Sequence, residues 1–219
     1  MSEDLVSGEP LSASKDCFYF IALVPPSPLQ ERIRLLQREI ADRFHSRAAL
    51  KSPPHITLIP PLSLSESGAG LLREELQRFS SASPCSDHHS DTPEGLSIVL
   101  DGFAAFAPRV LYIHVQPSVG LTRLRTLLRD RLQQHPVLKL PANPRHSYPF
   151  VPHITVGFRD LSPENFERAW AEFQQRSFQA NFIAEALTLL QHNGQHWEPI
   201  ASYPLTGIRD SLLTDPELS

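Results

Sequence analysis

Two near-identical pentapeptides constrain the fold and chemistry of this chain more than any other feature, and they lie 98 residues apart. They are Pro54-His55-Ile56-Thr57-Leu58 and Pro152-His153-Ile154-Thr155-Val156. Side chains alternate along an extended strand, so in each copy the histidine and threonine point to one face and the isoleucine points to the other. The repeat therefore predicts two related strands that each present an imidazole and a hydroxyl to a shared cleft.

The segments before the two pentapeptides repeat the same order of elements. In the first half, 18–25 reads as a buried strand and 27–44 as a helix with one apolar face. In the second half, 109–115 reads as a strand and 119–134 as the matching helix. Strand, helix and motif strand thus occur twice, which predicts a duplication with two pseudo-equivalent lobes.

The rest of the chain completes one domain over residues 16–208. Acidic or polar composition without apolar periodicity predicts disordered tails at 1–15 and 209–219 and a polar loop at 80–93. The remaining elements are two helices, one short strand and a hairpin. We expect these helices at 66–79 and 163–175, the strand at 96–100, and the hairpin strands at 184–191 and 197–203 around Asn193-Gly194.

Composition excludes several classes of function. The net charge of −4 gives no global basic field for duplex DNA. The two cysteines lie in no zinc or disulfide pattern. No run approaches the ~18 apolar residues of a membrane span, and residues 1–15 do not resemble a secretory signal. We therefore expect a cytoplasmic monomer that does not bind membranes.

Paired imidazoles and hydroxyls suit acid–base chemistry on a phosphodiester. One imidazole can accept a proton from the attacking group while the other protonates the leaving oxygen. Threonine hydroxyls can donate hydrogen bonds to the non-bridging oxygens, where negative charge develops. The candidate catalytic residues are therefore His55, Thr57, His153 and Thr155. The alternative is a zinc site on the two histidines, but no Cys, Asp or Glu lies near either motif at ligand spacing.

Three residues near the second motif are candidates for contacts with the substrate. Tyr112 and His114 alternate on one strand, so both side chains point to the same face. That face is either the cleft wall or, for His114, a partly buried structural position. Arg159 follows the second motif and can bind phosphate, although a surface arginine without function is the competing interpretation.

On the two His-x-Thr motifs, the chain resembles the two-histidine (2H) phosphoesterase superfamily, which includes LigT-like 2′-5′ RNA ligases and RNA 2′,3′-cyclic phosphodiesterases. The resemblance extends over about 18–205 and is strongest to a bacterial branch with little biochemical characterisation. Family members with RNA cyclic phosphodiesterase activity carry an arginine shortly after each motif. Here Ile59-Pro60-Pro61 follows the first motif, and Arg159 is displaced by one residue in the second.

The resemblance implies a bilobal α+β fold in which two antiparallel sheets face a central cleft and helices pack outside. Chain order alone also fits a parallel α/β sheet. The resemblance further implies a metal-independent phosphodiesterase without cofactors that acts on RNA ends or small cyclic-phosphate nucleotides. Two alternatives stay open: 2′-5′ ligation of RNA, which the same two histidines can support, and a non-catalytic module that binds nucleotides or RNA ends.

Overall fold

The computed structural model describes residues 16–81, 95–138, 140 and 150–205. The tails expected at 1–15 and 209–219 lie outside the described residues, as does the loop expected at 80–93 except for its first two residues. Those two residues end a helix. Within the described part, no helix is both long enough and apolar enough to cross a membrane.

Eight strands and four α-helices alternate along the described chain, with two short 3₁₀ helices, η1 and η2. In chain order the elements are β1 (Cys17–Leu23), α1 (Ser27–Phe44), η1 (Ala48–Lys51), β2 (Ile56–Leu64), α2 (Glu66–Ser81), β3 (Leu96–Phe106), β4 (Val110–Val115), α3 (Val119–Gln133), η2 (Pro136–Leu138), β5 (His153–Gly157), α4 (Pro163–Phe173), β6 (Gln179–Ala184), β7 (Ala186–His192) and β8 (Trp197–Pro204).

All eight strands belong to one antiparallel sheet with the order β6-β3-β4-β5-β2-β1-β7-β8. The α+β class is confirmed, and a parallel sheet is excluded for these strands. The expected two sheets are instead two halves of one strongly curled sheet, because β2 and β5 form a register pair at the centre, Ile56 with Ile154. One residue pair joins the halves, so the sheet can bend sharply there while its strands remain continuous.

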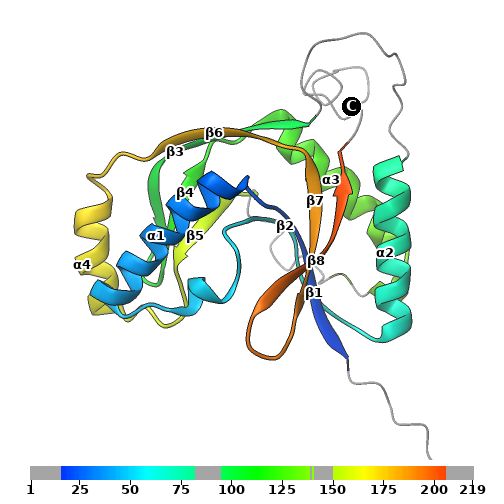
Figure 1. The fold of residues 1–219 in the computed structure, drawn as a ribbon, viewed down its shortest axis with the longest axis horizontal. Coiled ribbons are helices and arrows are strands. Elements are labelled where there is room, and N and C mark those ends of the chain that lie inside the picture. Colours follow the sequence, from blue (N-terminus) through cyan, green and yellow to red (C-terminus); the bar gives the residue numbers. More distant parts are fainter. Residues whose placement is uncertain (1–15, 82–94, 139, 141–149, 206–219) are drawn as a thin grey trace, which may run out of the picture.

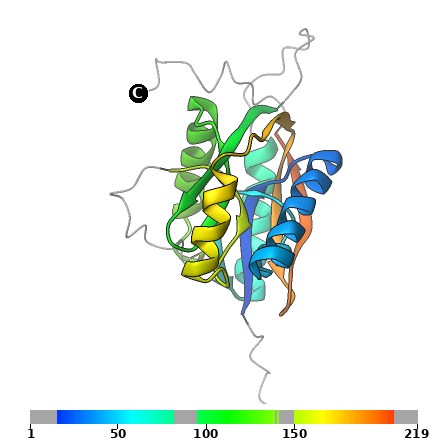
Figure 2. The same ribbon diagram turned by 90° about the vertical axis from the view of Figure 1, so that its left-hand side faces the viewer.

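The two halves of the sheet form two lobes that exchange helices. The first lobe carries β1, β2, β7 and β8 with helices α2 and α3, and the second carries β3 to β6 with helices α1 and α4 (Figure 1). Helix α1 follows β1 in the chain but packs against β5 and α4 of the other lobe. Helix α3 follows β4 and packs in the same exchanged way against β2 and α2 (Figure 2). The duplication is therefore interleaved.

Helix starts follow from local sequence. Ser118 caps α3 by accepting a hydrogen bond from the backbone N–H of Leu121 at 3.0 Å. Ser162 caps α4 in the same way from Asn165 at 3.2 Å, and Pro163 occupies the first turn, where its missing N–H costs nothing. These caps explain why the expected helix starts at 119 and 163 are correct.

Strand bounds were less predictable than helix bounds. Strand β3 continues to Phe106, beyond the expected end at 100, and the expectation did not include β6. Strand β2 continues through Pro60 and Pro61, which together lie opposite the single residue Phe20 of β1. Proline cannot donate to a strand ladder, so a bulge with two residues facing one accommodates this pair.

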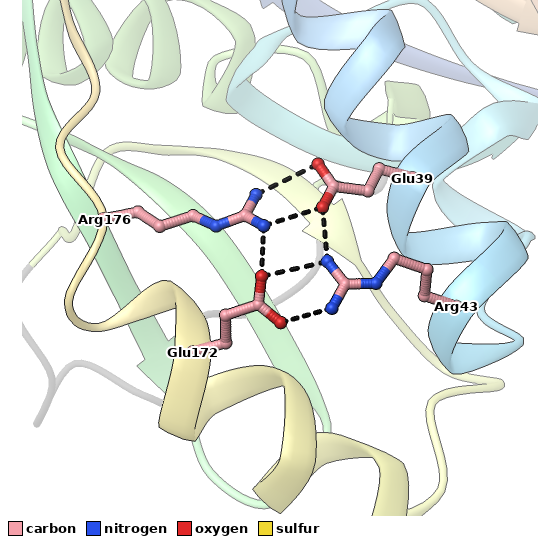
Figure 3. A network of polar contacts seen from close by, with 4 residues as sticks. All are labelled: Glu39, Arg43, Glu172 and Arg176. Atoms are coloured by element: carbon pink, nitrogen blue, oxygen red, sulfur yellow. Dashed lines mark hydrogen bonds and ion pairs between the residues drawn. The ribbon is translucent and has the colours of Figure 1, made fainter.

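A square of charged residues joins α1 to the end of α4 in the second lobe (Figure 3). Arg176 donates to both carboxylate oxygens of Glu39, at 3.0 and 2.8 Å, and also pairs with Glu172. Arg43 donates to Glu39 at 2.6 Å and to Glu172 at 2.9 Å. Hydrogen bonds from Arg176 lower the pKa of Glu39, and hydrogen bonds from Arg43 lower the pKa of Glu172. The square thus holds the exchanged helix on its lobe.

Replacement of Arg176 with glutamine should lower the free energy of unfolding at pH 7 by on the order of 1 kcal/mol, since the square is partly exposed to solvent. Both carboxylates have lowered pKa values in the folded state, so this stabilisation is present above their unfolded pKa and is lost as pH falls. Urea denaturation at pH 7 and at acid pH should therefore show a difference from wild type that shrinks on acidification. Arg38→Gln, at an exposed position of α1, is the matched control.

Candidate active site

The two motifs meet where β2 and β5 form their single register pair. Ile56 is paired with Ile154 in antiparallel register. One step to either side of this pair, the same register sets His55 opposite Thr155 and Thr57 opposite His153. The duplicated motif is therefore arranged about an approximate twofold axis, with each imidazole facing the hydroxyl of the other copy.

The four motif side chains share one face of the sheet, which we call the open face. Ile56, Leu58, Ile154 and Val156 point to the opposite face and are fully buried in the main core with residues from the helices. His55, Thr57, His153 and Thr155 alternate with them and remain partly accessible. The isoleucines thus anchor the strands, and the polar residues stay available for a ligand.

Both imidazoles are held by the same backbone hydrogen bond. Nδ1 of His55 lies 2.7 Å from the carbonyl oxygen of Pro53, and Nδ1 of His153 lies 2.8 Å from that of Val151. A carbonyl only accepts, so each Nδ1 carries the hydrogen and each neutral ring leaves Nε2 as an acceptor. The intervening proline fixes φ of the chain just before each histidine. Both rings therefore present the nitrogen that can take up or release a proton.

Burial favours the neutral form of both imidazoles. Burial, together with the charge of His153, lowers the pKa of His55 to about 4, while the bond of His55 to the Pro53 carbonyl opposes this shift. Burial also lowers the pKa of His153, while its bond to the Val151 carbonyl opposes that shift. A charge on one imidazole disfavours a charge on the other, and an anion between them would stabilise their protonated forms.

Aromatic rings surround each imidazole, and no sequence pattern singled out most of them. The ring centroid of Phe20 lies 4.7 Å from that of His55 and 4.7 Å from that of Trp197. In the second lobe, His153 lies 5.0 Å from Tyr112 and 5.1 Å from Phe106. A Phe within a buried strand reads as core, so only the strand register could have revealed these contacts.

Two polar residues of α1 brace the two motifs against each other. Nε2 of Gln37 donates to the backbone carbonyl of Thr155 at 3.0 Å, and Gln37 is only 2% exposed. Arg34 donates to the carbonyls of Leu50 and Ser52, in the segment that leads to His55, at 3.1 and 2.9 Å. Gln37 stands four residues from Ile33 on the apolar face of the helix. A polar residue on that face is unusual, and this is the sequence signal that could have identified Gln37 as a structural contact.

The structure brings two of the three suggested substrate-binding residues to the site. Tyr112 is paired with Thr155, and His114 is paired with His153, so both lie on the open face next to the second motif. Arg159 lies beyond the end of β5 at a left-handed position, φ 50°, with its guanidinium over the ring of Phe158 at 5.0 Å. Its role in binding phosphate stays a prediction.

A search of the described ranges for a metal centre finds no group of three His, Cys, Asp or Glu side chains that could hold an ion. Imidazoles, hydroxyls and aromatic rings are the functional groups that the motifs and their neighbours present on the open face.

A bilobal α+β protein with two facing His-x-Thr motifs has the architecture of LigT-like proteins. Solved structures of this kind include Escherichia coli LigT in complex with 3′-AMP, with a TM-score of 0.59 at 20% identity over 88% of this chain and 99% of LigT. A protein of Thermus thermophilus matches with a TM-score of 0.57 at 18% identity over 87% of this chain and 98% of its own. At these identities the likeness concerns the fold alone.

Sequence comparison establishes the family. Residues 25–196 match the profile of the 2′-5′ RNA ligase superfamily, and the chain belongs to this superfamily. A protein of Geobacillus kaustophilus, described by inference as a phosphoesterase, is 28% identical over 71% of this chain and 77% of its own length. A similarly described protein of Geobacillus sp. strain WCH70 is 26% identical over 73% of this chain and 79% of its own.

The two motif histidines should remain neutral at neutral pH. In an NMR titration of the imidazole resonances, His55 should titrate near pH 4 and His153 below the ordinary value of 6.5, because burial disfavours both charged rings. Since unfolded histidines bind protons at higher pH, stability should fall as pH drops from about 6.5 towards 4. A His55 midpoint near 6.5 would contradict the burial that the structure gives this ring.

Proposed function

We propose that the protein is a phosphodiesterase that hydrolyses a 2′,3′-cyclic phosphate, or a related small phosphodiester, on RNA ends or nucleotides. The observation that carries this proposal is the matched pair of imidazoles, each with Nδ1 bound to a carbonyl and Nε2 left as an acceptor. Membership of the superfamily supports phosphodiester chemistry. The complex of E. coli LigT with 3′-AMP supports a nucleotide as ligand.

In the proposed reaction the phosphate lies between His55 and His153. One neutral imidazole accepts a proton from water as its oxygen attacks phosphorus. The bond from phosphorus to one ribose oxygen breaks, and the other imidazole, protonated, gives that oxygen a proton. Thr57 and Thr155 donate hydrogen bonds to the two non-bridging oxygens, where charge increases in the transition state. The products are a phosphomonoester and a free hydroxyl.

A second imidazole must be protonated for this reaction, although burial alone keeps both neutral. A bound phosphate supplies the compensating negative charge, because an opposite charge within a few ångströms raises a histidine pKa. The substrate would thus create the acid that its own cleavage requires. The same groups run in reverse would join a cyclic phosphate to a 5′-hydroxyl, which is the 2′-5′ ligation alternative.

Purified protein should convert nucleoside 2′,3′-cyclic phosphates to monophosphates in the presence of EDTA. The two imidazoles supply both proton transfers, so we expect no requirement for a divalent ion. The pH–rate profile should be bell-shaped, because one imidazole must be neutral and the other protonated. Product release is measured by chromatography from acid to alkaline pH. Activity lost in EDTA and restored by Zn²⁺ or Mn²⁺ would overturn the mechanism, while tight nucleotide binding without turnover would favour the binding module.

His55→Ala and His153→Ala should each lower turnover about 10²-fold or more, because each removes a proton-transfer partner. Thr57→Ala and Thr155→Ala should cost on the order of 10–10³-fold, because each removes one hydrogen bond to the phosphoryl group. The double histidine variant should be little worse than the poorer single variant, since the pair acts as a unit. Full activity of either histidine variant would refute its role.

His196→Ala is the matched control for these variants, because His196 is an exposed histidine of the β7–β8 hairpin. It should retain wild-type turnover. Circular dichroism and thermal melting of all variants separate loss of chemistry from loss of fold, and folded histidine variants with normal melting are the expected result.

A further inference from the structure

A polar hollow of about 370 Å³ lies in the second lobe, where β3, β6 and the end of β4 meet. It is distinct from the rings that surround His55 and His153. Three carboxamides and one carboxylate supply its polar groups, and the remaining lining comes from Val99, Leu100 and Ala180. The polar residues are Asp101, Gln116, Gln179 and Asn181.

Strand register sets this hollow on the open face. Leu100 is paired with Val115, and both are buried in the core. Their neighbours in sequence, Asp101 and Gln116, point to the other side, and the backbone N–H of Gln116 donates to the carbonyl of Val99 at 2.9 Å. That side is the one on which His114 lies opposite His153.

A row of polar side chains therefore runs from the motif into the hollow. His153 is paired with His114 on β4, and Asp101 of β3 is paired with Gln179 of β6. With strands about 4.8 Å apart, Asp101 stands two strands, or roughly 10 Å, from His153. A separation of this order is needed for a phosphate at the histidines and the far, hydrogen-bonding edge of a purine on the same ribose. The β3 bulge just beyond Asp101, at Gly102 with φ 71°, is a device that re-aims neighbouring side chains.

The carboxylate of Asp101 is the strongest hydrogen-bond acceptor of the hollow, and most of its capacity is unused. Asp101 is exposed and accepts one long hydrogen bond, from Nε2 of Gln116 at 3.4 Å. An ionised carboxylate only accepts, and it has two oxygens for paired N–H donors. A carboxylate here repels phosphate, so this end of the row suits the uncharged part of a nucleotide.

We propose that the hollow binds the base of the nucleotide whose phosphate lies between the motif histidines, and that it selects guanine; this rests on the proposed function. Guanine presents N1–H and N2–H₂ side by side, which match the two oxygens of Asp101, and O6 next to them, which matches Nε2 of Gln116. Adenine turns a lone pair at N1 towards the carboxylate. Uracil flanks its single N–H with two carbonyls, and cytosine offers only its amino group.

The experiment compares guanosine and adenosine 2′,3′-cyclic phosphates on wild type, Asp101→Asn and Gln116→Met. We expect wild type to favour guanosine by about 10-fold or more in kcat/KM, as for one good bidentate base contact. Asp101→Asn should bring the guanosine-to-adenosine ratio of kcat/KM close to one, mainly by raising KM for the guanosine substrate. Gln116→Met should lower the same ratio. Asp130→Asn, which removes an exposed carboxylate from α3, should leave both rates unchanged.

Calorimetric binding of 3′-GMP and 3′-AMP tests the hollow independently of turnover. Tighter binding of 3′-GMP that Asp101→Asn abolishes supports the proposal even if no cyclic nucleotide is cleaved, an outcome that would refute the proposed hydrolysis alone. Equal affinity for the two nucleotides in wild type, or a guanine preference that survives Asp101→Asn, overturns the proposal even if hydrolysis is efficient.

Discussion

One residue pair, Ile56 with Ile154, joins the two halves of the sheet and brings the two motifs together on the open face. The two isoleucines are buried in the core, so neither strand can rotate without exposing apolar surface. A slip of one residue in either strand would turn that strand's histidine into the core and its isoleucine towards solvent. Packing on one side of the sheet thus fixes chemistry on the other side. Gln37 strengthens this constraint because its bond to the Thr155 carbonyl ties β5 to helix α1.

The pair of imidazoles is symmetric in its hydrogen bonds and asymmetric in its surroundings. Both Nδ1 atoms bind a carbonyl two residues earlier in the chain. His55, however, packs on Phe20, while His153 lies against Tyr112 and Phe106. The shared bond sets the same tautomer for both rings, and burial lowers the pKa of each. Unlike surroundings are the means by which two identical groups can come to differ in proton affinity.

The sequence predicted the elements and motifs that occur twice. It did not predict the contacts that depend on pairing between strands far apart in the chain. The helix starts at 27, 119 and 163 followed from prolines and caps close in sequence, and the positions of the two motifs followed from strand alternation. The continuity of the sheet rests on a single pair between residues 98 apart, and no local pattern encodes it. Phe20 resembled any core phenylalanine in the sequence, and Phe106 lay beyond the expected end of its strand, so neither contact with an imidazole could be read before the strand pairing was known. The sequence analysis did not single out Gln37, although it lies on the apolar face of its helix, and no local pattern indicates its partner, the Thr155 carbonyl.

The exchange of helices between the lobes has a consequence for how the protein assembles. Helix α1 leaves β1 to cover β5, and helix α3 leaves β4 to cover β2, so each lobe takes one of its two covering helices from the other half of the chain. Cut between the repeats, neither half could complete a core. The arrangement resembles a domain-swapped dimer within a single chain, with one helix exchanged in each direction. The helix that covers each motif strand is thus supplied by the repeat that carries the other motif, so both histidines depend on one shared core.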